Sequence, residues 1–166
     1  MSGSGAPETE PLDGSRLRIG VVATRWHPTI AGGLLAGARR GLADGSVTDV
    51  VEVRVPGAFE LPIAAMALAQ RGYDAVVALG VVIRGGTPHF DYVCRAATDG
   101  LTRVTLDTGI PVGFGLLTCD NEEQALDRCG LPESSEDKGR EAALAAVETA
   151  LLVRRLHHGD GHGEAD

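Results

Sequence analysis

The chain has 166 residues, a length typical of a single domain. Its hydrophobic content of 43% is sufficient for a core, and that core must be mainly aliphatic because only 4% of the residues are aromatic. A net charge of -8 and a pI near 5.1 argue against a nucleic-acid-binding surface, so we expect no nucleic-acid partner.

We expect no signal peptide and no membrane span in this sequence. No apolar run reaches the ~18 residues of a membrane span, and the first residues lack the basic and apolar regions of a signal peptide. The three cysteines, Cys94, Cys119 and Cys129, form no CxxC pair, which favours reduced thiols over a structural zinc site. We therefore expect a cytoplasmic protein with no metal site.

The two ends of the chain differ in composition from its middle. Residues 1–15 are small, polar and rich in Pro and Gly, which predicts a flexible N-terminal arm. We expect residues 16–156 to form one domain and residues 157–166 a disordered tail. The tail carries His157, His158 and His162, and its Gly-rich composition favours a frayed terminus over a metal site.

A strand is predicted over residues 17–24, followed by a helix whose apolar face contains Ile30, Leu34, Ala38 and Leu42. The only tryptophan, Trp26, lies where the carboxyl end of this strand meets the helix. Ligands of open α/β sheets bind at such carboxyl ends, so Trp26 is a candidate binding residue. The alternative is an indole that covers the core, because tryptophan is commonly buried.

A second strand is predicted over residues 47–55 and is followed by the segment PGAFELP, residues 56–62. Gly57 allows close approach of the backbone, and a helix through Ala69 begins near Glu60. A glutamate at this position can bind a ligand or can simply complement the helix dipole.

The third strand is predicted over residues 75–83, an uninterrupted apolar run typical of a strand buried on both faces. Arg84, Gly85 and Gly86 break it, Thr87 is suited to cap the next helix, and Pro88 to its first position. The helix is indicated by apolar residues at helical spacing: Phe90, Val93, Ala97, Leu101 and Val104.

A strand, a glycine turn and a helix N-terminus together form an anion site, because unpaired N–H groups point at a ligand that the backbone can approach closely. His89 would lie in the first turn of this helix. The positive potential there favours a neutral imidazole that can accept a proton, which suggests a catalytic role. The alternative is an ordinary surface histidine.

A fourth strand is predicted over residues 110–117. Asp120 is expected to cap a short helix, with Glu123 completing a capping box and Gly130 ending the helix. Arg128, in the last turn, can bind an anion or complement the helix C-terminus. The final helix is predicted from Lys138 to about Leu156. Four strands alternating with helices predict a flavodoxin-like three-layer α/β/α sandwich with a four-stranded parallel sheet in the order 2-1-3-4.

Motifs of other nucleotide-binding and hydrolytic folds are missing. The sequence has no GxxxxGK[ST] and no GxSxG, and the pair Gly113 and Gly115 lacks the third glycine of a dinucleotide site. Instead, residues 17–155 resemble the lumazine synthase family. The resemblance is carried by five ordered segments: RWH, PGAFELP, GVVIRGGTPHFDYV, EEQALDR and DKG.

The resemblance implies an enzyme of riboflavin biosynthesis. It implies condensation of 5-amino-6-(D-ribitylamino)uracil with 3,4-dihydroxy-2-butanone 4-phosphate to 6,7-dimethyl-8-ribityllumazine, phosphate and water, without a metal or organic cofactor. His89 is the implied proton shuttle. The implied phosphate ligands are Gly85, Gly86, Thr87 and Arg128. The implied pyrimidine and ribityl contacts are Trp26, Ala58, Phe59, Glu60, Val82, Ile83, Phe114 and Lys138.

The resemblance also implies a homo-oligomer with active sites between adjacent subunits, Phe114 lying against a neighbour's site. Residues 129–137 are about two residues longer than in family members that form 60-subunit shells, so we expect a homopentamer. Gly86 replaces a bulkier residue, commonly Ala or Gln, which should loosen the phosphate loop but leave its backbone donors intact.

Three other functions are compatible with parts of the sequence. A lumazine- or flavin-binding carrier would keep Trp26 and an apolar pocket but would not need both His89 and Arg128. A structural shell protein would need neither residue. Archaeal-type riboflavin synthases share the fold but differ in chemistry, and the segment GGTPH with Arg128 favours lumazine synthase over them.

Overall fold

Four parallel strands form the centre of the structure, a computed structural model that describes residues 11–159. The strands are ordered β2-β1-β3-β4. Their bounds are β1 (Arg18–Thr24), β2 (Asp49–Val55), β3 (Ala75–Ile83) and β4 (Val112–Cys119). The predicted parallel sheet and its strand order are therefore confirmed.

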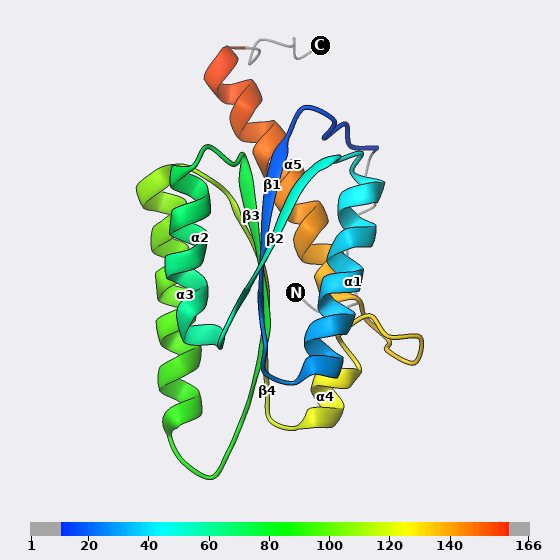
Figure 1. Ribbon diagram of the computed structural model, residues 1–166, viewed down its shortest axis with the longest axis vertical. Helices are drawn as coiled ribbons and strands as arrows, with labels where there is room; N and C mark the ends of the chain where they lie inside the picture. The colour runs from blue at the N-terminus through cyan, green and yellow to red at the C-terminus, as the bar shows by residue number, and fades with distance from the viewer. Residues whose placement is uncertain (1–10, 160–166) are drawn as a thin grey trace, which may run out of the picture.

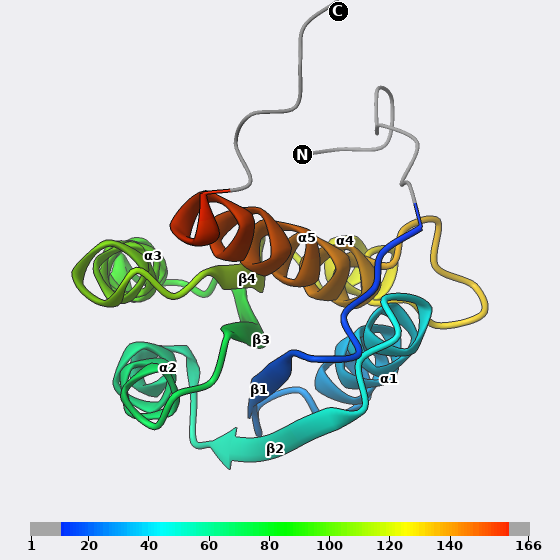
Figure 2. The same ribbon diagram turned by 90° about the horizontal axis from the view of Figure 1, so that it is seen from above.

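Helices cover both faces of the sheet, as Figures 1 and 2 show. One face packs against α1 (Pro28–Asp44) and α5 (Lys138–His158), and the other against α2 (Leu61–Gln70) and α3 (His89–Thr108). Two short helices, η1 (Ala58–Glu60) and α4 (Glu122–Leu126), follow the carboxyl ends of β2 and β4. The three-layer α/β/α sandwich is confirmed.

β3 lies at the centre of this sandwich, between β1 and β4 and under helices on both sides. Its residues from Ala75 to Val81 are all buried, and their side chains alternate between the two core clusters. The continuous apolar run was the basis for predicting a doubly covered strand, and that prediction is confirmed. The predicted apolar face of α1 is also buried, with Ile30, Leu34, Ala38 and Leu42 each 2% exposed or less.

Helix α5 packs closely against α1 through glycines. A Cβ atom on Gly139 would overlap the carbonyl oxygen of Leu34 and would lie 2.8 Å from the carbonyl carbon of that residue. Gly41 faces the backbone of Arg140 in the same way: a Cβ atom on Gly41 would lie 2.7 Å from the carbonyl oxygen of Arg140. The two helix backbones are therefore in direct contact, and this contact fixes α5 over the sheet.

Several predicted boundaries were wrong. β2 begins at Asp49, two residues later than predicted, and α4 ends at Leu126 and not at Gly130. β4 begins and ends two residues later than predicted, because its pairing with β3 continues to Ile83 and Cys119. Thr87 does not cap α3: Pro88 has helical dihedral angles, and its carbonyl accepts the first hydrogen bond, from the Asp91 N–H at 3.0 Å. The N-cap of α4 is Asn121 rather than Asp120, and its side chain accepts from the Gln124 N–H at 2.9 Å.

At the C-terminus, α5 continues through His157 and His158, two residues past the predicted domain boundary. The remaining tail with His162, and residues 1–10 of the expected arm, lie outside the described residues. Within residues 11–159, no helix is long and apolar enough to cross a membrane.

Candidate functional site

Most of the candidate site residues lie where β1, β2 and β3 end, at the lower end of the sheet in Figure 1. Trp26 follows β1, η1 follows β2, and the loop of residues 84–88 follows β3. Thr24 pairs with Val55 at the last position of the β1–β2 ladder, so Trp26 and η1 leave the sheet side by side. We call this part of the molecule the carboxyl edge.

Two aromatic rings at the carboxyl edge face outward. Trp26 is 68% exposed and Phe59 is 66% exposed. The exposure of Trp26 excludes the alternative in which its indole covers the core of its own chain. The ring lies alongside Gly57, where a Cβ atom would be 3.4 Å from Trp26 Cδ1. An exposed indole beside a glycine leaves its other face available for stacking on a planar ligand.

Glu60 and Ala58 come from the turn η1. The Glu60 carboxylate accepts a hydrogen bond from the Gly57 N–H through Oε2 at 2.8 Å, so this glutamate stabilises the start of the helical turn. Ala58 is buried. Val82 and Ile83 are half-buried at the end of β3, next to the loop of residues 84–88.

The loop after β3 is open to solvent. Gly85, Gly86, Thr87 and His89 are all exposed, and a Cβ atom on either glycine would meet nothing within 4 Å. Among the described residues, none accepts a hydrogen bond from the N–H groups of Gly85, Gly86 or Thr87. These donors lie at the N-terminus of the 20-residue helix α3, which is an arrangement suited to an anion.

The other three candidate residues, Phe114, Arg128 and Lys138, line a separate groove of about 750 Å³ along β4. We call it the β4 groove. None of the candidate residues of the carboxyl edge lines it. β4 is an edge strand of the sheet, and Phe114 in its middle is 48% exposed. The chain therefore brings the candidate residues together in two groups and not in one.

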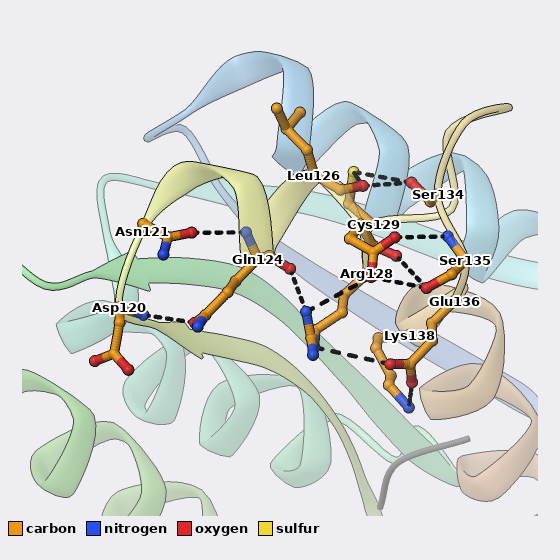
Figure 3. A network of polar contacts seen from close by, with 11 residues as sticks. Asp120, Asn121, Gln124, Leu126, Arg128, Cys129, Ser134, Ser135, Glu136 and Lys138 are labelled. Atoms are coloured by element: carbon orange, nitrogen blue, oxygen red, sulfur yellow. Dashed lines mark hydrogen bonds and ion pairs between the residues drawn. The ribbon is translucent and has the colours of Figure 1, made fainter. Parts of the chain in front are cut away.

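Arg128 was predicted to lie in the last turn of α4. In the structure it lies two residues beyond the end of that helix. Its Nη1 donates to the Gln124 carbonyl at 2.8 Å, and its Nε lies 3.8 Å from Glu136 Oε1 (Figure 3). Arg128 thus complements the helix C-terminus and also faces the β4 groove. The structure bears out the contact with the helix C-terminus, and anion binding by Arg128 stays a prediction.

Lys138 contacts the carboxylates of Glu136 and Glu141, the latter at 2.9 Å. Burial lowers the pKa of the Lys138 amine, but its hydrogen bonds with these two glutamates outweigh burial and raise the pKa above its ordinary value. Lys138 is therefore a cation in the β4 groove.

The sequence of this chain matches a known enzyme family over most of its length. The model of the 6,7-dimethyl-8-ribityllumazine synthase family matches residues 16–154. The chain belongs to this family. Membership in the lumazine synthase family implies small-molecule substrates and an oligomeric assembly.

The chain is similar over nearly its whole length to proteins named 6,7-dimethyl-8-ribityllumazine synthase. One from Kineococcus radiotolerans is 68% identical over 154 residues, which cover 93% of this chain and 95% of that protein. One from Kocuria rhizophila is 68% identical over 155 residues, covering 92% and 99%. One from Streptomyces coelicolor is 58% identical over 156 residues, covering 94% and 97%.

Two charged residues in these groups were not singled out from the sequence. Glu136 lies between Arg128 and Lys138, and its main chain is fixed by hydrogen bonds to Asp127 and Gly130 at 3.0 and 3.1 Å. Arg84 lies at the start of the loop between β3 and α3. The only sequence signal for Glu136 was its position between Arg128 and Lys138. No sequence signal marked Arg84, because its partner Asp120 is 36 positions away.

Proposed function

We propose that this chain is a transferase that condenses 5-amino-6-(D-ribitylamino)uracil with 3,4-dihydroxy-2-butanone 4-phosphate to form 6,7-dimethyl-8-ribityllumazine in riboflavin biosynthesis. One observation carries the proposal: a chain of this family places exposed aromatic rings and unpaired N–H groups together at the carboxyl edge. The rings suit a planar pyrimidine, and the N–H groups suit a phosphate.

The substrates would be held by both groups of residues. Gly85, Gly86 and Thr87 bind the phosphate through their N–H groups, and Arg128 binds it through its guanidinium. The pyrimidine stacks on Trp26. Its remaining contacts and those of the ribityl chain come from Ala58, Phe59, Glu60, Val82, Ile83, Phe114 and Lys138. Because Phe114, Arg128 and Lys138 line the separate β4 groove, we infer that the β4 groove of one copy meets the carboxyl edge of an adjacent copy.

The chemistry requires mainly orientation and proton transfer. The 5-amino group attacks the ketone and loses one water to give an imine, and phosphate then leaves by elimination. The ribitylamino nitrogen attacks the new carbonyl group, and loss of a second water closes the ring. His89, exposed beside the phosphate loop, accepts and returns the protons of these steps. Holding the two reactants together supplies most of the acceleration.

Turnover of the two substrates, followed by the absorbance of the lumazine product, tests this function. We expect saturable product formation by the unchanged chain. For His89→Asn we expect a kcat about 10- to 100-fold lower, at or below the usual ~10²–10⁴-fold effect of proton transfer because orientation supplies most of the acceleration. His158→Asn, at the far end of α5, is the matched control and should leave kcat unchanged.

Two outcomes would contradict this assignment. Full turnover by His89→Asn would remove the proton shuttle from the mechanism. Tight binding of lumazine or flavin, with no product above the uncatalysed reaction, would instead favour the non-catalytic carrier on the same fold.

The proposed assembly is a homopentamer. It is supported by the loop of residues 129–137, which projects from the domain in Figure 1. An isolated antiparallel β-bridge between Cys129 and Asp137 joins the two ends of this loop. Light scattering should give five chains of 17.2 kDa, about 86 kDa, and a particle of sixty chains, about 1 MDa, would overturn the proposal. We also propose a cytoplasmic location, consistent with the free thiols of Cys94, Cys119 and Cys129.

A further inference from the structure

Arg84 joins the two ends of the phosphate loop. Its N–H donates to the carbonyl of Cys119, the last residue of β4, at 2.9 Å. Its Nε donates to Asp120 Oδ1 at 2.9 Å, and its Nη1 lies 3.3 Å from Asp91 Oδ1 in the first turn of α3. The guanidinium carbon lies 4.2 Å from the centroid of the Phe90 ring, which the planar group covers.

The segment between these attachment points has little else to hold it. Residues 85–88 are exposed, and the two glycines adjoin open space. Glycine backbone is intrinsically permissive, so the conformation of such a loop depends on how its ends are held. At one end is Arg84 itself, and at the other are Phe90 and Asp91, which the Arg84 side chain contacts. One residue therefore contacts both ends of the loop.

The guanidinium of Arg84 is paired more closely with carboxylates than that of Arg128, whose nearest carboxylate oxygens lie at 3.8 and 3.9 Å, and this favours a positioning role for Arg84 over direct phosphate binding. Asp120 and Asp91 face its guanidinium, and their carboxylates raise the pKa of Arg84, Asp120 most strongly. The positive charge is thus already matched by two negative charges at short distance. Exposed ion pairs of this kind contribute little to global stability, so their effect should appear locally, in the loop.

We propose that Arg84 is a positioning residue: it bridges Asp120 and the first turn of α3 so that the N–H groups of Gly85, Gly86 and Thr87 converge on the substrate phosphate. The inference rests on the proposed function of this loop. Arg84 acts through the loop and does not touch the reacting atoms.

The test compares Arg84→Lys and Asp120→Asn with the control Arg103→Ala. Arg103 also lies on α3 but away from the loop, and it makes an exposed ion pair with Asp107 at 3.2 Å. Kinetics with both substrates separate phosphate handling from pyrimidine handling. Phosphorus NMR titration with inorganic phosphate gives an equilibrium dissociation constant that does not depend on turnover.

For Arg84→Lys and Asp120→Asn we expect the KM of the butanone phosphate and the dissociation constant of inorganic phosphate to rise about tenfold, as expected for a misplaced binding loop. The KM of the pyrimidine should change by less than about twofold, because Trp26 and η1 are not attached to Arg84. Lysine should not rescue, since an ammonium group cannot bridge two carboxylates and cover a ring as a guanidinium does. Arg103→Ala should match the unchanged chain.

Other outcomes overturn the proposal in distinct ways. If Arg84 binds phosphate directly, Asp120→Asn releases its guanidinium and tightens phosphate binding, and Arg84→Lys keeps most of the affinity. If the contacts only stabilise the fold, the variants lower the melting temperature and affect both substrates alike. If the unchanged chain binds phosphate but does not turn over, the proposed function fails while the role of Arg84 is still decided by the titration. If it binds no phosphate, the positioning role is wrong.

Discussion

Arg128→Ala should lower kcat/KM for the butanone phosphate by about 100-fold or more, the loss expected when a bidentate charge-assisted contact to a phosphate is removed. Arg128 is already held in the β4 groove by the Gln124 carbonyl at 2.8 Å and by Glu136. Because its orientation is set before substrate binds, little side-chain freedom is lost on binding. The fall in kcat/KM for Arg128→Ala should therefore be larger than the fall in kcat for His89→Asn.

Two further variants make this result specific. Arg128→Lys should recover only a small part of the activity, because an ammonium group cannot bind two phosphate oxygens in a planar fork. Arg140, in the first turn of α5, is another exposed arginine and pairs with Asp44 of α1 at 2.7 Å. Arg140→Ala should leave the kinetics unchanged. Equal losses in Arg128→Ala and Arg140→Ala would mean that the effect is general and not due to phosphate binding.

The same variant tests whether the active site is shared between copies. If Arg128 acts on the carboxyl edge of an adjacent copy, a chain with Arg128→Ala and a chain with His89→Asn carry their defects in different halves of a site. Coexpression should then give mixed oligomers in which some sites have both halves intact, with more activity than either variant alone. No recovery in verified mixed oligomers would place Arg128 and His89 in the site of one chain.

The sheet could be predicted from the sequence because its signals are local and unambiguous. The apolar run from Ala75 to Val81 can be buried only under helices on both faces, and the 3.6-residue period of α1 marks its buried side. Helix ends were less predictable. Thr87 and Asp120 have suitable side chains, but the helical hydrogen bonds begin one residue later in each case, at a position set by how the chain leaves the sheet.

The site was predictable in part. Trp26 could be placed at a strand end, but whether it was buried or exposed depended on the packing of residues distant in sequence. The contact of Arg84 with Asp120 joins residues 36 positions apart, and it exists because β3 and β4 are neighbours that end together. The separation of Phe114, Arg128 and Lys138 from the carboxyl edge follows from the position of β4 at the edge of the sheet.

Gly139→Ala should destabilise the fold by about 3 kcal/mol, at the upper end of the usual effect of overpacking. The Cβ atom would overlap the Leu34 carbonyl oxygen and approach its carbonyl carbon and Cα to 2.8 and 2.9 Å. These are backbone atoms of α1, so no side chain can turn aside to make room. The two helices would have to separate, and the close contacts that α1 and α5 make at Gly41 and Gly139 would be lost.

Denaturant unfolding followed by circular dichroism, at one fixed concentration of the oligomer, measures this change. Gly32→Ala is the control, since it lies on the exposed side of α1 where a Cβ atom would meet nothing within 4 Å. It should raise stability by about 0.5–1 kcal/mol, because alanine is the better helix former. Opposite signs for two identical substitutions would identify backbone contact between α1 and α5 as the cause. An unchanged midpoint for Gly139→Ala would mean that the helices are not in that contact in solution.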